Sequence, residues 1–219
     1  MMRSRTAVVA LAAWIVPSAV LGGPVTGTVR TVTREGAAAA AAIVYAEPLD
    51  GPAPRRPQSF TLTQKDKTFR PQILAVPAGS TVEFPNEDSI FHNVFSLSWP
   101  QPFDLGLYRA GSTRSRTFTQ PGDYRVFCNI HPQMTALILV VATPYVARPG
   151  PDGRFVLDLP PGRYRLTAVS GRAAPASGEV VAAAGTVDAP LLTLDESTWV
   201  EARHKNKYGQ DYPAAAYKQ

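Results

Sequence analysis

The only cysteine of the chain, Cys128, lies close to a histidine and a methionine. The segment 124–141 reads YRVFCNIHPQMTALILVV, so that His131 follows Cys128 by three residues and Met134 follows His131 by three. A thiolate, an imidazole and a thioether on one short loop form a soft ligand set that suits copper. The copper site with these ligands has two histidines and one cysteine in a plane and a weak axial methionine. A second histidine must therefore come from another part of the chain.

His92 is the obvious second histidine. The chain has three histidines, and His92 begins the apolar run HNVFSL, thirty-six residues before Cys128. The third, His204, lies in a polar tail. We interpret His204 as a solvated residue, with an accessory copper ligand or a partner contact as alternatives.

Each of these residues also has an ordinary structural interpretation. Met134 alone is typical of a core filler, His92 of a hydrogen-bonded core residue, and Cys128 of a small buried hydrophobe. A single cysteine in an exported chain cannot form an internal disulfide, so it pairs with another chain, stays a thiol or binds a metal. Metal binding alone also explains why His131 and Met134 lie beside it.

Other chemistries fit the residues less well. A nucleophilic Cys128 with a histidine base leaves Met134 without a role, and zinc prefers cysteine, histidine and carboxylate to a thioether. Multicopper oxidases need many more histidines. Because only His204 is left over, a second copper like that of nitrite reductase would need ligands from other subunits. The sequence therefore predicts that the chain is not an enzyme.

The elements that must position these residues are short β-strands. From Val25 onward, short apolar runs are punctuated by proline and glycine, with no helical periodicity before the tail. We expect an antiparallel or mixed β-sandwich and a long irregular excursion at WPQPFDLGLYRAGS, residues 99–112.

Two segments resemble the cupredoxin family, most closely its amicyanin and plastocyanin branch. They are PAGSTVEFPNEDSIFHNV, which contains His92, and PGDYRVFCNIHPQM, which contains Cys128. The resemblance covers residues 58–142 and implies a Greek-key β-sandwich that binds one copper ion. The three-residue step from His131 to Met134 is similar to that of amicyanin.

The resemblance also implies a role for each residue around the copper. The four ligands it implies are His92, Cys128, His131 and Met134. Asn93 is expected to tie the two ligand loops together, and His131 is expected to be the route for electrons at the surface. The expected dry shell is Phe91, Val94, Phe127, Ile130 and Pro132, with Trp99, Pro100 and Pro102 extending the apolar surface. One departure is Asn129-Ile130, where amicyanins usually carry Thr-Pro.

The two ends of the chain resemble a second family, the carboxypeptidase-regulatory-like domain, a small sandwich related in form to transthyretin. The resemblance rests on DGRFVLDLPPGRYRLTAVSG and GEVVAAAGTVDAPLLTL, together with VTGTVR and AAIVYAEP near the start. It implies a discontinuous domain, residues 24–50 plus 143–196, with the copper domain at 58–142 inserted. Two sandwiches in tandem are the alternative. Residues 197–219 are expected to form a polar, flexible tail.

Residues 1–23 are typical of an export signal. Arg3 and Arg5 precede an apolar core, and small residues follow before Pro24. An uncleaved membrane anchor is the alternative, but the run is short for a span and contains Pro17. Cleavage leaves 20 basic and 17 acidic residues, a charge too small to indicate nucleic acid binding. We therefore expect a periplasmic protein without a stable membrane span.

These observations together favour electron transfer. The similarity to amicyanin implies a dehydrogenase, such as methylamine dehydrogenase, as electron donor and a c-type cytochrome as acceptor. The alternative is a periplasmic protein that binds or handles copper without a redox partner. The sequence also leaves open an adhesion module in which the regulatory-like domain is the functional part.

Overall fold

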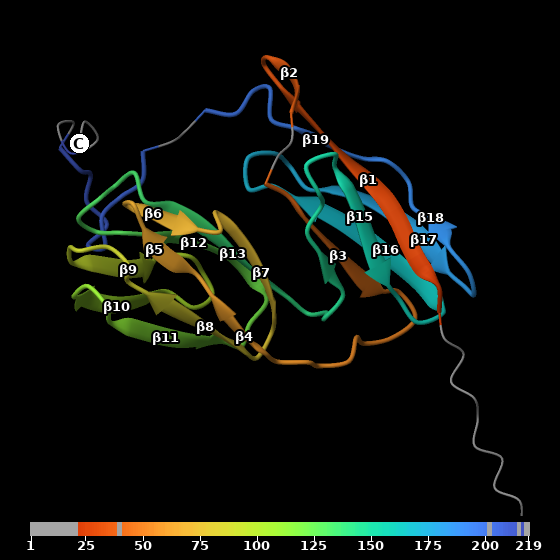
Figure 1. Ribbon diagram of the computed structural model, residues 1–219, viewed down its shortest axis with the longest axis horizontal. Helices are drawn as coiled ribbons and strands as arrows, with labels where there is room; N and C mark the ends of the chain where they lie inside the picture. The colour runs from red at the N-terminus through yellow and green to blue at the C-terminus, as the bar shows by residue number, and fades with distance from the viewer. Residues whose placement is uncertain (1–21, 39–40, 201–202, 214–215, 217–219) are drawn as a thin grey trace, which may run out of the picture.

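The computed structural model describes residues 22–38, 41–200, 203–213 and 216, and the elements within them are all β-strands (Figure 1). The all-β fold class predicted from the sequence is therefore confirmed. In these residues no helix is long and apolar enough to cross a membrane. The predicted export signal falls on residues 1–21, which lie outside the described residues, and on the two glycines that follow.

The middle of the chain forms two sheets and a short hairpin. The larger sheet has the strand order β10-β9-β12-β13-β7, the smaller sheet has the order β11-β8-β4, and β5 pairs with β6. The bounds are β4 (Ser59–Thr61), β5 (Thr63–Lys65), β6 (Thr68–Arg70), β7 (Ile73–Pro77), β8 (Ser80–Pro85), β9 (His92–Ser96), β10 (Phe103–Tyr108), β11 (Thr113–Phe118), β12 (Gly122–Phe127) and β13 (Thr135–Val141). The two sheets share one core, to which Phe84 and Phe118 contribute from the smaller sheet and Tyr124 and Ile138 from the larger.

The two ends of the chain pair with each other. β1 lies between β15 and β18, and further along it also pairs with β2 and β19, while a second sheet has the order β14-β3-β16-β17. The bounds are β1 (Pro24–Thr33), β2 (Gly36–Ala38), β3 (Ile43–Pro48), β14 (Val146–Ala147), β15 (Arg154–Asp158), β16 (Gly162–Val169), β17 (Ala176–Ala182), β18 (Val187–Asp188) and β19 (Leu192–Asp195). A separate core fills the space between these sheets and includes Val44, Phe155, Leu166 and Leu192.

The two groups of strands pack against each other through β13. Side chains alternate along this strand: Ile138 faces the core of the middle sheets, whereas Leu137 and Leu139 belong to a third cluster with Ile43 of β3 and Val169 of β16. Figure 1 shows β7 and β13 on the side of their sheet that faces β3. Both faces of β13 are therefore buried, which explains its continuous apolar sequence.

One strand lies where the sequence predicts an irregular excursion. β10 pairs antiparallel with β9, but the register shifts between Asp104 and Leu107. Gly106 at this bulge has a φ angle of 74°, a left-handed conformation that glycine adopts without strain. The bulge breaks the alternation of apolar and polar residues, and the prediction of an excursion at 99–112 is wrong for this reason.

Candidate metal centre

Two neighbouring strands bring three of the predicted ligands together. His92 is the first residue of β9, and Cys128 directly follows Phe127, the residue of β12 that pairs with β9. The loop that begins at Cys128 is closed by its own backbone. The N–H of Met134 donates to the carbonyl of His131 (2.9 Å), and the N–H of Cys128 donates to the carbonyl of Met134 (3.2 Å).

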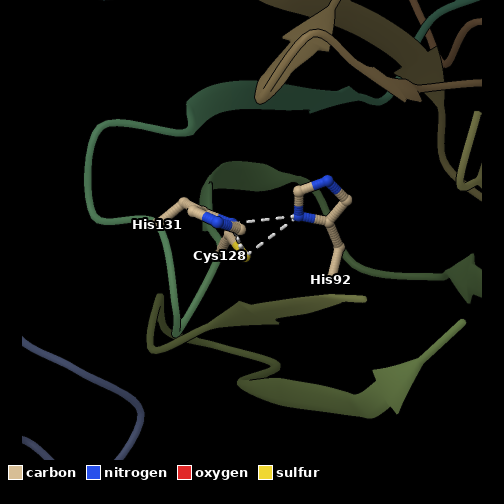
Figure 2. Close-up of side chains that lie close together, drawn as sticks. All are labelled: His92, Cys128 and His131. Atoms are coloured by element: carbon tan, nitrogen blue, oxygen red, sulfur yellow. Dashed lines mark hydrogen bonds between the residues drawn. The ribbon is translucent and has the colours of Figure 1, made fainter. Parts of the chain in front are cut away.

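The three side chains point at one another, as Figure 2 shows. The Sγ atom of Cys128 lies 3.7 Å from Nδ1 of His92 and 3.8 Å from Nδ1 of His131, and the two Nδ1 atoms are 3.2 Å apart. Two nitrogens and a sulfur with this spacing can each lie about 2.0–2.3 Å from one ion placed between them. The His-Cys-His cluster therefore fits a type 1 copper site.

Asp88, which the sequence analysis missed, fixes the orientation of the His92 ring. Its Oδ2 lies 2.7 Å from Nε2 of His92, and both side chains are largely buried. Because the carboxylate accepts a hydrogen bond, Nε2 carries the proton and Nδ1 presents its lone pair to the cluster. The only signal was the spacing of four residues in DSIFH.

The turn between β5 and β6 holds Asp88 in place. The backbone N–H groups of Asp66 and Lys67 donate to its carboxylate at 2.6 and 3.0 Å, and these two residues have φ angles of 53° and 52°. Burial acts to raise the pKa of Asp88. The hydrogen bonds from Lys67, His92 and Asp66 outweigh it, so that the pKa is lowered and the carboxylate stays charged.

The Cys128 sulfur is fully buried and surrounded by backbone donors. Burial raises the pKa of the Cys128 thiol, against the effect of the backbone N–H groups of Asn93, Ile130 and His131, which favour the thiolate. Without a positive charge the thiol keeps its proton, and a cation held by these residues would favour the thiolate. The environment of Cys128 is therefore suited to a metal ligand and unsuited to a free nucleophile.

His131 is the more exposed of the two histidines. His92 has no exposed surface, whereas His131 is partly exposed. Burial and the neighbouring His92 lower the pKa of His131, which keeps its ring neutral. Phe91 and Ile130, each next to a ligand histidine in the chain, are 54% and 45% exposed. Each ligand histidine therefore has an exposed apolar residue beside it in the chain.

The remaining residues of the predicted shell separate into buried and exposed groups. Val94 and Pro132 are buried and Phe127 is partly buried, so that they exclude water from the cluster, whereas Trp99 is 85% exposed. Met134 is fully buried in the same core cluster as Cys128. Its role as axial ligand stays a prediction.

The side chain of Asn93 bonds to β10, whereas its backbone N–H reaches the Cys128 sulfur and so links the two ligand-bearing segments. Its Nδ2 donates to Oδ1 of Asp104 at 2.6 Å, and its own Oδ1 has no hydrogen-bond partner within the described part of the chain. Asp104 comes from β10, the strand that the sequence does not predict. The side-chain amide of Asn93 is therefore directed towards β10.

His204 is only partly exposed, and it is not part of the His-Cys-His cluster. Its two ring nitrogens face carbonyl oxygens, that of Pro132 at 2.6 Å and that of Lys205 at 2.9 Å. Its ring stacks on Phe127 at 4.0 Å between centroids. The interpretation of His204 as a simply solvated residue is wrong, because its ring packs on Phe127 and its nitrogens face two carbonyl oxygens.

Comparisons with known proteins give partial matches. No family model matches the chain. The chain is similar to the Cu-containing nitrite reductase from Thermus scotoductus SA-01, with 31% identity and a TM-score of 0.37, over 42% of this chain and 26% of that chain. A purple cupredoxin from Nitrosopumilus maritimus has 25% identity and a TM-score of 0.34, over 37% of this chain and 98% of that chain. A mutant of amicyanin with Cu(I) has 22% identity and a TM-score of 0.36, over 38% and 82% of the two chains.

One of these similar structures is an enzyme, and this corrects a prediction. The prediction that the chain is not an enzyme is contradicted by the similarity to the nitrite reductase, of which this chain spans 26%. The prediction depended on counting histidines. The number of histidines in one chain does not decide whether the protein takes part in catalysis. A centre that exchanges electrons can pass them to a catalytic site elsewhere in an assembly.

Proposed function

We propose that this protein binds one copper ion through His92, Cys128, His131 and Met134 and passes single electrons. The observation that carries the proposal is the triangle of two imidazole nitrogens and one sulfur, with sides of 3.2, 3.7 and 3.8 Å. The bond from His92 to Asp88 supports it, because it directs the lone pair of the ring towards the triangle.

The chain's own residues make the site suitable for rapid electron exchange. A copper ion supplies the one-electron couple when it is bound. His92 and Cys128 are held on paired strands and have no exposed surface, so few atoms can move and water is excluded. The ring of His131 reaches the surface beside Ile130, and a docked partner would come closest to the site there.

The partners we propose are a dehydrogenase as donor and a c-type cytochrome as acceptor, in the periplasm. The exposed Ile130 beside the partly exposed His131 supports docking of a redox partner there, and such transient complexes bury small areas. The basic and apolar start of the chain supports export.

We also propose that residues 24–50 plus 143–196 form one regulatory-like sandwich into which the copper domain, residues 58–142, is inserted. The pairing of β1 with β15 and β19, and of β3 with β16, supports a single unit made from both ends of the chain. The separate cores of the two groups of strands support the division.

A redox titration of the copper-loaded protein tests the proposed function. Metal analysis should give one copper per chain, and the copper should undergo a reversible one-electron transition. After chemical reduction of the copper, oxidised cytochrome c should reoxidise it. A protein that binds copper but shows no reversible transition would instead be a copper-handling protein, and the proposed function would be wrong.

A further inference from the structure

The C-terminal segment 203–212 lies on the loop that carries Cys128 and His131. Figure 1 shows the chain returning from β19 to the end of the middle sheets where β9 and β12 lie. There His204 contacts the carbonyl of Pro132 and stacks on Phe127, with an angle of 21° between the rings. The hydroxyl of Tyr212 donates to the carbonyl of Cys128 at 3.4 Å.

This segment has a defined structure of its own. Lys205 and Asp211 form an antiparallel bridge, and the N–H of Asn206 donates to the carbonyl of Gln210 at 2.8 Å. The resulting turn brings the ring of Tyr212 edge-on to the ring of His204, with 5.3 Å between centroids. The two aromatic side chains therefore contact the ligand loop as one unit.

Lys207 joins the segment to the ligand loop and, through Asp104 of β10, to the strand that begins with His92. Its backbone N–H donates to Oδ1 of Asn129 at 3.0 Å, and its Nζ donates to Oδ2 of Asp104 at 2.8 Å. The other oxygen of Asp104 accepts from Asn93, the residue after His92. A continuous chain of hydrogen bonds therefore runs from the His92 strand through Asp104 and Lys207 to the residue after Cys128.

We propose that His204, Lys207 and Tyr212 are positioning residues of the metal centre, and that the segment 203–212 holds the ligand loop in its binding geometry before the metal arrives. The segment adds a second link between the His92 strand and the ligand loop, beside the backbone N–H of Asn93 that reaches the Cys128 sulfur. It also gives a role to the departure at Asn129, whose side chain accepts from the segment. For its effect on copper this inference rests on the proposed function.

The contacts of the segment stabilise the ligand loop more than the whole fold. The segment contributes one ion pair with a partly buried lysine, one stacked ring pair and three hydrogen bonds to residues 127–132 and Asp104. Contacts of this size each change the local opening of a loop severalfold, and here they add to the two backbone hydrogen bonds that close the loop itself. Loss of the segment's contacts should therefore increase local opening first in residues 128–134.

Hydrogen exchange of the metal-free full-length protein tests the inference. The double variant His204→Ala with Lys207→Met removes the stacking, the Pro132 bond and the ion pair. We expect backbone amides in 128–134 to exchange about tenfold faster, with no change in β16. The matched control is Gln210→Ala, an exposed side chain of the same segment, and it should exchange like the parent. If the double variant does not fold, Lys207→Met alone gives the same test with a change of about threefold.

A second readout separates positioning from general stability. In the copper-loaded double variant the reduction potential should shift and copper loss to a chelator should be faster, while Gln210→Ala matches the parent. Unchanged exchange at 128–134 in a folded variant overturns the inference. If copper gives no thiolate band even in the parent, the proposed function fails, but the exchange experiment still decides whether the segment holds the loop.

Discussion

Oδ2 of Asp88 lies 2.7 Å from Nε2 of His92, on the side of the ring opposite the His-Cys-His cluster. A carboxylate in this position fixes the tautomer of a ligating histidine and raises its basicity. We predict that Asp88→Asn weakens copper binding by about 10- to 100-fold, as measured by competition with a chelator. The control is Glu87→Gln, which removes a charge from an exposed neighbour that pairs with Lys65. Equal affinities for Asp88→Asn and the parent would contradict a role for Asp88.

The bond between Asp104 and Lys207 gives a testable dependence on pH. Burial acts to raise the pKa of Asp104, but hydrogen bonds from Lys207, Asn93 and Gly106 outweigh it, and the pKa is lowered. Because the pKa of Asp104 is lower in the folded state, its charged carboxylate stabilises the protein at pH values above the ordinary aspartate pKa of 3.8. This contribution is lost as the pH falls through the folded-state pKa.

Urea unfolding of the parent and Asp104→Asn from pH 7 to pH 2.5 measures this contribution. The parent should be more stable than the variant at neutral pH, and the difference should disappear below the ordinary aspartate pKa. Because the Asp104 side chain is 40% exposed, the difference should be small. A difference that stays constant over the whole range would show that the charge of Asp104 is not responsible.

Because β13 packs between the two groups of strands, we predict that shortening a side chain on its outer face lowers the free energy of unfolding. Leu139 is 5% exposed and belongs to the cluster with Val169 of β16, so Leu139→Ala should lower the free energy of unfolding by about 2–5 kcal/mol. Val181→Ala, at a side chain that is 62% exposed, should change it by less than about 0.5 kcal/mol. Similar small effects for both variants in thermal unfolding would argue against the packing of the two groups.

The sequence predicts the parts of this molecule that depend on local patterns. Cys128, His131 and Met134 share one short loop, and the alternation of apolar residues in β12 and β15 is visible without a structure. The repeated PGDY and PGRY motifs form equivalent turns, in which the hydroxyls of Tyr124 and Tyr164 donate to carbonyls four residues earlier.

Contacts between distant polar residues could not be predicted in this way. Asp104 and Lys207 are 103 residues apart, and neither lies in a periodic pattern that indicates a partner. The bulge in β10 hides the strand that carries Asp104, and the polar composition of the tail is equally typical of a disordered segment. Pairing of side chains through hydrogen bonds leaves little signal in a single sequence.

The visible absorption spectrum of the mature protein with one equivalent of Cu(II), beside that of Cys128→Ser, tests the central claim most directly. The geometry of the cluster predicts an intense thiolate-to-copper band at the red end of the spectrum in the parent and its loss in the variant. A parent protein that binds copper without this band, or a band that remains in Cys128→Ser, would contradict a copper centre built on Cys128.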